Sequence, residues 1–145
     1  MAADLRKTLF EELTRVQVGF LGVQDQTILR PQPMVHMCSQ DRRDIWFLAA
    51  ADSDLVRILG DGTCGIYCLA GYNHDFHATL SGPLRPVPDR QGLEQVWSSQ
   101  AERLFPGGLG DIEWTPLKLT MEEASVWQSR AQIDASIRGC VIRFV

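Results

Sequence analysis

The sequence predicts a mainly β domain in which six short strands form a mostly antiparallel barrel, closed or half-closed, with helices packed outside it. Apolar residues alternate with polar ones or form short uninterrupted runs over most of the chain, as strands require. Glycine, proline and small polar residues separate these runs. Strands and helices do not alternate as in a βαβ fold, which favours helices covering a barrel.

Length and composition indicate one domain spanning residues 1–145. A chain of 145 residues with 45% hydrophobic and 22% charged residues can bury a single core. No apolar run is long enough to cross a bilayer, and no secretory signal precedes the first helix, so we expect a cytoplasmic protein.

Charge and cysteine patterns exclude other classes. The net charge is −4, and twelve arginines and two lysines form no basic stripe, so nucleic-acid binding is not expected. Cys38, Cys64, Cys68 and Cys140 lack CxxC spacing and are expected to pack as small apolar residues. Cys64 and Cys68 would face the same side of a strand, which leaves a metal pair as an alternative.

The first third of the chain predicts one helix and two strands. Leu5, Leu9 and Leu13 recur at helical spacing, so we expect a helix from Asp4 to about Arg15. A strand apolar on both faces follows from residue 16 to 23, and a second runs from the prolines at 31 and 33 to about residue 38.

The middle of the chain predicts three strands around a short helix. Residues 45–50 are apolar throughout, as in a strand buried on both faces. Asp52 or Ser53 would cap a helix that stops at Gly60, and a fourth strand spans residues 63–70. The fifth strand, residues 76–87, has one apolar face and one polar face that carries His77; that polar face could meet solvent, a subunit or a ligand.

The last third predicts two helices and a strand. Asp89 would cap a helix that continues to Leu104, and a glycine-rich surface loop follows at 105–110. The sixth strand covers 117–121 and a short apolar piece lies around 126–127. A final helix is expected from near-helical spacing of apolar residues between Ile133 and Phe144.

The helix after the third strand is the sharpest candidate for a ligand site, because free N–H groups at a helix start can hold a phosphate. Asp52 and Asp54 would oppose an anion, whereas Arg57 and Arg30 could offset them. The alternative is an ordinary capped helix. His74 and His77 have metal-like spacing but would lie on opposite faces of a strand, so a zinc site is not expected.

The order of several motifs resembles the pyridoxamine phosphate oxidase-like flavoproteins, and within them the bacterial general stress proteins. The resemblance covers roughly residues 5 to 130. The motifs that carry it are Gln32-Pro33-Met34, Ile45-Trp46-Phe47, Asp52-Ser53-Asp54-Leu55-Val56, Asp75-Phe76-His77-Ala78, Ser81-Gly82-Pro83-Leu84, Val96-Trp97, Phe105-Pro106-Gly107-Gly108 and Ala124-Ser125-Val126-Trp127.

The resemblance implies an FMN-binding split β-barrel, with FMN or FAD bound at the interface of a homodimer. Position by position it implies that Gln32 and Met34 approach the flavin and that Phe47, Leu48 and Ala49 contact it through their backbone. It further implies that Ser53, Asp54 and Leu55 meet the phosphate and that His77 reaches the flavin from the partner subunit.

Two departures bear on function. Many relatives have arginine where this chain has Gln32, and many have lysine where it has Leu55. Each missing cation removes a charge-assisted hydrogen bond of about 1.5–3 kcal/mol, which is roughly tenfold or more in affinity, unless backbone N–H groups or Arg30 take its place.

The resemblance implies a small-molecule oxidoreductase linked to a stress response, with a nicotinamide donor and no assignable catalytic residue. The alternatives are a non-enzymatic dimer that stores flavin or lacks it, and a haem protein that uses His36, His74 or His77.

Overall fold

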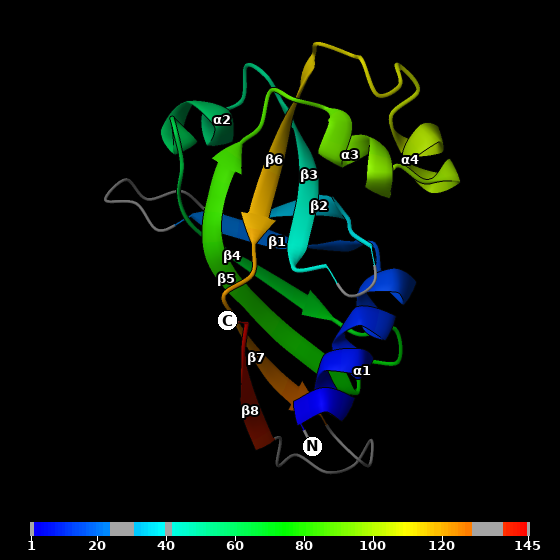
Figure 1. Ribbon diagram of the computed structural model, residues 1–145, viewed down its shortest axis with the longest axis vertical. Helices are drawn as coiled ribbons and strands as arrows, with labels where there is room; N and C mark the ends of the chain where they lie inside the picture. The colour runs from blue at the N-terminus through cyan, green and yellow to red at the C-terminus, as the bar shows by residue number, and fades with distance from the viewer. Residues whose placement is uncertain (1, 24–30, 40–41, 129–137, 145) are drawn as a thin grey trace.

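The computed structural model describes residues 2–23, 31–39, 42–128 and 138–144, and in them a single antiparallel sheet closes on itself (Figure 1). The strand order is β4-β1-β2-β3-β6-β5-β7-β8, with a further pairing between β4 and β5. The elements are α1 Ala2–Arg15, β1 Val18–Val23, β2 Gln32–Met37, β3 Asp44–Ala50, α2 Asp54–Leu59, β4 Thr63–Ala70, β5 Phe76–Pro86, α3 Gln91–Val96, α4 Ser99–Leu104, β6 Trp114–Thr120, β7 Glu123–Gln128 and β8 Arg138–Arg143.

The pairing of β4 with β5 closes strands β1 to β6 into the predicted six-stranded antiparallel barrel, which confirms the split-barrel fold. Strands β7 and β8 extend the sheet from β5 beyond the ring. Among the described helices, none is long and apolar enough to span a membrane.

The predicted final helix is wrong over Arg138–Arg143, where the chain forms β8. Ile142 is buried and Val141 is exposed, so the side chains alternate as in a strand. Strand β8 pairs with the edge of β7, which supplies its hydrogen-bonding partners. A short apolar segment can fit the spacing of a helix and that of a strand equally well, and here the pairing with β7 makes it a strand. The rest of that expected helix lies outside the described residues.

The helix expected from Asp89 to Leu104 is two helices, α3 and α4. The break falls at Trp97 and Ser98, where the Ser98 hydroxyl accepts a hydrogen bond from the Ala101 N–H at 3.1 Å and starts α4. A serine side chain competes for backbone N–H groups in this way, so it begins a new helix more readily than it continues one. The short apolar piece around residues 126–127 belongs to β7.

Two apolar clusters build the molecule. The larger fills the barrel and includes Phe47, Tyr67 and Leu80, with Leu9 and Leu13 of α1 packed against it. The smaller lies outside the barrel between β3 and the helices α3 and α4; its buried members are Met37, Trp46, Leu48, Leu93, Ala101 and Phe105. Successive residues of β3 therefore enter different clusters, which explains its uninterrupted apolar sequence.

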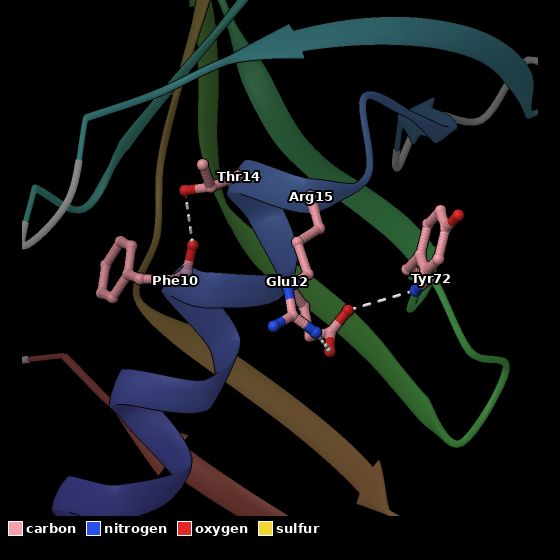
Figure 2. A network of polar contacts seen from close by, with 5 residues as sticks. All are labelled: Phe10, Glu12, Thr14, Arg15 and Tyr72. Carbon is pink, nitrogen blue, oxygen red and sulfur yellow. Dashed lines mark hydrogen bonds and ion pairs between the residues drawn. The ribbon is translucent and has the colours of Figure 1, made fainter.

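Helix α1 is tied to the turn between β4 and β5 by Glu12, whose side chain is buried (Figure 2). One carboxylate oxygen accepts a hydrogen bond from the Tyr72 N–H at 3.1 Å, and the other lies 4.0 Å from the Arg15 guanidinium. A Cβ atom at Gly71 would lie 2.8 Å from Glu12 Oε2, so only glycine leaves room for this approach. The contact fixes the turn from which β5 and His77 begin.

Candidate functional site

The barrel is split between β2 and β3. Among the described residues, these strands pair at His36 with Phe47 and at Met37 with Trp46, and nowhere else. From Leu48 to Ala50, β3 pairs with β6 alone among the described residues, and β2 turns away from it (Figure 1). We call the opening between residues 32–35 of β2 and residues 48–50 of β3 the split. Its β3 edge has no strand partner in the described chain. The Ala50 carbonyl accepts a hydrogen bond from the Ser53 N–H at 2.9 Å, and the other backbone groups on this edge need hydrogen-bonding partners.

The side chains of the predicted flavin contacts on β2 and β3 are mostly buried. Met34, Phe47 and Ala49 belong to the barrel core, and Leu48 belongs to the cluster under α3 and α4. Gln32 is half-buried, and its amide nitrogen lies 3.6 Å from Met34 Sδ. The backbone along the split and the Gln32 amide are therefore the groups of these two strands most able to meet a ligand.

The start of α2 is an ordinary capped helix start. The Ser53 hydroxyl accepts a hydrogen bond from the Val56 N–H at 3.3 Å. Asp54 is exposed and forms an ion pair with Arg57, and Leu55 is buried in the barrel core. Arg57 therefore already has a carboxylate partner, and Leu55 places an apolar side chain where many relatives place a cation. Arg30, the other arginine considered for a phosphate, lies outside the described residues.

A buried polar chain holds β2 beside the split. Tyr67 of β4 passes beneath Gly19 of β1, and its hydroxyl lies 2.9 Å from the Met34 carbonyl oxygen and 2.6 Å from His36 Nδ1. His36 Nε2 lies 2.8 Å from the Leu13 carbonyl oxygen, to which it donates. Two strands and α1 are thus joined through one tyrosine and one histidine.

Burial sets the protonation of these groups. It lowers the pKa of His36 below its usual value, so the imidazole is neutral. It raises the pKa of Tyr67, and it raises the pKa of the Cys38 thiol to about 11. Both ring nitrogens of His36 are occupied inside the protein, which argues against its use as a haem ligand.

His77 is not brought to the split within one chain. It is half-buried on the outer face of β5, paired with Ala70 of β4 and Trp127 of β7. Helix α2 lies near the other end of β5, where Leu84 pairs with Thr63. Seven residues of strand separate His77 from Leu84, or roughly 23 Å at about 3.3 Å per residue.

An apolar surface surrounds His77, and we call it the outer strip. It crosses β1, β4, β7 and β8, and its members are Val18, Phe20, Ile66, Cys68, Trp127 and Val141. Phe20 is 53% exposed and Val141 is 51% exposed. The register places Phe20, Cys68, Thr79, Ser125 and Val141 in one row. A hollow of about 350 Å³ within the strip is lined by Phe20, His77 and Trp127.

Sequence reasoning did not find the outer strip as a unit. Two signals for it were visible: Val18 and Phe20 alternate with Leu21 on a strand apolar on both faces, and Cys64 and Cys68 share a face of the next strand. The strip also needs β8, which was expected to be helical. Contiguous exposed apolar surface of this kind is typical of an interaction site.

Comparison with known proteins gives a family and a set of similar folds. The sequence profile described as pyridoxamine 5'-phosphate oxidase like matches residues 4–141. No curated protein matches the chain at a significant level.

The solved structures similar to this chain include three bacterial stress proteins. A general stress family protein from Xanthomonas campestris pv. campestris is 24% identical, with a TM-score of 0.80 over 95% of this chain and 96% of that one. A general stress protein 26 from Jannaschia sp. CCS1 is 23% identical, with a TM-score of 0.78 over 98% and 99% of the two chains. The general stress FMN/FAD binding protein from Xanthomonas citri is 24% identical, with a TM-score of 0.78 over 94% and 96%. At this identity the likeness establishes the fold.

Proposed function

The chain belongs to the pyridoxamine 5'-phosphate oxidase-like family, and from that premise we propose that it binds a flavin nucleotide, FMN or FAD, at the split. The observation that carries the proposal is the edge of β3 at residues 48–50, which has no strand partner in the described chain. A flavin ring carries hydrogen-bond donors and acceptors along its rim, which suit a free strand edge. The similar Xanthomonas citri protein is itself described as FMN/FAD binding.

The residues present fit the ring better than the phosphate. Backbone groups from Phe47 to Ala49 and the Gln32 amide would hold the ring system, and Ser53 lies where the phosphate end is expected. Gln32 and Leu55 stand where the family resemblance leads us to expect cations, and among the described residues the nearby Arg57 is already paired with Asp54. Phosphate should therefore contribute little to affinity, and FMN should bind only modestly more tightly than riboflavin.

We further propose that a second copy of the chain covers the outer strip and completes the site with His77. The strip is apolar, spans several strands and includes a hollow beside His77. One chain leaves His77 roughly 23 Å along the strand from the α2 end, so a residue from a second copy is needed if His77 is to meet the same flavin. Burial of exposed apolar surface gives such a dimer its driving force.

Bound flavin supplies electron-transfer chemistry, and the protein supplies position and exclusion of water. An oxidoreductase acting on a small molecule in a stress response is the activity we favour, with a reduced nicotinamide as donor. The second candidate is a dimer that stores flavin without turnover or has lost it; Gln32 and Leu55, which stand where the family resemblance led us to expect cations, favour that candidate. The cytoplasmic location expected from the sequence stays a prediction.

Flavin titration tests the proposal that the protein binds FMN or FAD at the split. After addition of FMN and removal of free flavin by gel filtration, we expect the protein to retain absorbance at about 450 nm, and we expect binding to saturate at roughly micromolar concentration. Gln32→Arg should raise FMN affinity about tenfold, the worth of one charge-assisted hydrogen bond, and leave riboflavin affinity unchanged. Gln91→Arg, on the exposed face of α3, is the matched control and should alter neither. Lack of saturable binding by the wild type would refute the flavin proposal.

The molecular mass of the protein in solution tests the proposal that a second copy of the chain covers the outer strip. Phe20→Asp should give a monomer by light scattering and lower flavin affinity, because it buries a carboxylate in the apolar interface. Ile112→Asp is the control: Ile112 is 86% exposed and lies outside the outer strip. Equal masses for Phe20→Asp and the wild type would exclude the strip as the dimer interface. His77→Ala should weaken flavin binding without dissociating the dimer.

Turnover separates the two candidate functions. With flavin bound, consumption of NADH or NADPH in the presence of oxygen or an artificial acceptor supports an oxidoreductase. Stable binding without consumption of either nicotinamide supports the storage protein.

A further inference from the structure

A second cavity lies at the end of β2 away from Gln32, and its lining residue Gln17 directly precedes Val18 of the outer strip. Its walls come from the last turn of α1, the end of β2 and the junction of α3 with α4, and its volume is about 290 Å³. That volume is at the small end of ligand pockets, which run from roughly 300 to 1,000 Å³. We call it the helix groove.

The helix groove carries positive charge and no negative charge from its own lining. Arg103 lines it, and no aspartate or glutamate does. Within the described chain Arg103 has no ion pair or hydrogen bond, whereas Arg15, Arg57 and Arg143 each lie within ion-pair distance of a carboxylate. Burial raises the pKa of the Cys38 thiol to about 11, so this lining group is also uncharged.

Several acceptors in the groove are already occupied, whereas the Gln17 side-chain oxygen and the oxygen of the Thr14 hydroxyl, which donates to the Phe10 carbonyl, accept no hydrogen bond in the described chain. The Leu13 carbonyl accepts from His36, and the Gln100 side-chain oxygen accepts from the Gln17 amide. The Ser98 oxygen accepts from the Ala101 N–H, which leaves its O–H free to donate. Donors therefore remain in excess: the Arg103 guanidinium, the hydroxyls of Ser98 and Ser99, and the Gln100 amide.

The opposite wall is apolar. Leu13, Met37 and Val96 line the same groove as the donors. A ligand that fits must present an anionic acceptor to one side and a compact apolar body to the other. A carboxylate matches the forked donors of arginine and the serine hydroxyls beside them.

We propose that the helix groove is a binding site for a small organic monocarboxylate, held by Arg103, Ser98 and Ser99 against an apolar wall. The proposal does not depend on flavin binding, because the groove and the split lie at different ends of β2. It adds to the protein a second ligand site, formed by helices that the barrel itself does not need for closure.

Benzoate is the probe, and benzamide is its uncharged counterpart. In a backbone amide NMR titration of the full chain, benzoate should shift resonances of residues 14–17 and 98–103 in a saturable manner. Benzamide should bind at least tenfold more weakly, because it lacks the charge that pairs with Arg103. The same shifts should occur with and without added FMN.

Two arginine variants complete the test. Arg103→Met should weaken benzoate at least tenfold, and Arg103→Lys should restore most of the affinity. Arg85→Met is the matched control, since Arg85 is also exposed without a carboxylate partner in the described chain but lines a different cavity. Absence of saturable shifts, shifts centred elsewhere, equal affinity for benzamide, or an unchanged affinity in Arg103→Met would each overturn the proposal.

Discussion

Gly19 is the position where one methyl group should do most damage to this fold. Tyr67 reaches from β4 across β1 to β2 only because Gly19 has no side chain. A Cβ atom at Gly19 would lie 2.6 Å from Tyr67 Cζ, 2.8 Å from its hydroxyl oxygen and 2.6 Å from the Cys68 carbonyl oxygen. Gly19→Ala must therefore displace the tyrosine ring.

The magnitude follows from two terms. Overpacking of a filled core costs about 1–3 kcal/mol. Displacing Tyr67 also breaks its contacts with His36 and the Met34 carbonyl, and unsatisfied buried groups cost roughly 1–3 kcal/mol. We expect Gly19→Ala to lower the free energy of unfolding by about 3–5 kcal/mol and the melting temperature by roughly 10–15 °C.

The assay is chemical denaturation followed by circular dichroism at one protein concentration. The matched control is Gly22→Ala in the same strand, where the nearest atom to the new Cβ would be Pro31 Cγ at 3.5 Å, an ordinary contact. That variant should lie within about 1 kcal/mol of the wild type, since alanine in a strand is no worse than glycine. If the two variants prove equally stable, the passage of Tyr67 beneath Gly19 does not hold β2 as described.

Three further predictions concern single side chains. Burial lowers the pKa of His36 in the folded protein. As pH falls below about 6.5, the unfolded chain therefore binds a proton that the folded chain does not. The free energy of unfolding should fall by up to about 1.4 kcal/mol per pH unit until the pH reaches the folded-state pKa. His36→Gln should lose this component of the pH dependence and His74→Gln, at an exposed turn, should retain it, as denaturation at several pH values will show. Ser53→Ala should cost α2 about 0.5–2 kcal/mol and Ser53→Asp should recover most of it, because both serine and aspartate cap helices; equal melting of all three proteins would contradict the capping role. Arg90 donates to the carbonyls of Leu109 and Trp114 at 2.7 and 2.8 Å, so Arg90→Met should accelerate amide hydrogen exchange across residues 105–113, and unchanged exchange there would show that these bonds do not hold the loop.

Local patterns predicted most of the barrel correctly. The strict alternation of β5 fits a strand, because a strand places successive side chains on opposite faces. The short uninterrupted apolar run of β3 is typical of a strand buried on both faces. The sequence offered Asp52 or Ser53 as the cap of α2 and Gly60 as its stop, and in the structure Ser53 is the cap and Gly60, with a φ of 55°, ends the helix.

One error falls where pairing with another strand decides the structure, and the other falls where a local helix cap decides it. The segment at 138–143 fits a helix or a strand, and its pairing with β7 makes it a strand. The helix expected through Trp97 and Ser98 breaks because the Ser98 hydroxyl bonds the backbone ahead of it, and α4 then packs separately on β3.

In the candidate site, too, some features could be predicted from the sequence and others depend on the tertiary structure. Sequence alone determined roughly which residues form strands β1 to β6. Through its motifs it also determined the family and the two positions, Gln32 and Leu55, where cations were expected. Only the tertiary structure decided that β2 parts from β3 after two pairs, that Tyr67 bridges β4 to β2, that the outer strip is continuous across several strands, and that His77 stands away from the split. The physical reason is that pairing of strands and packing of side chains join residues tens of positions apart, and no local periodicity contains that information.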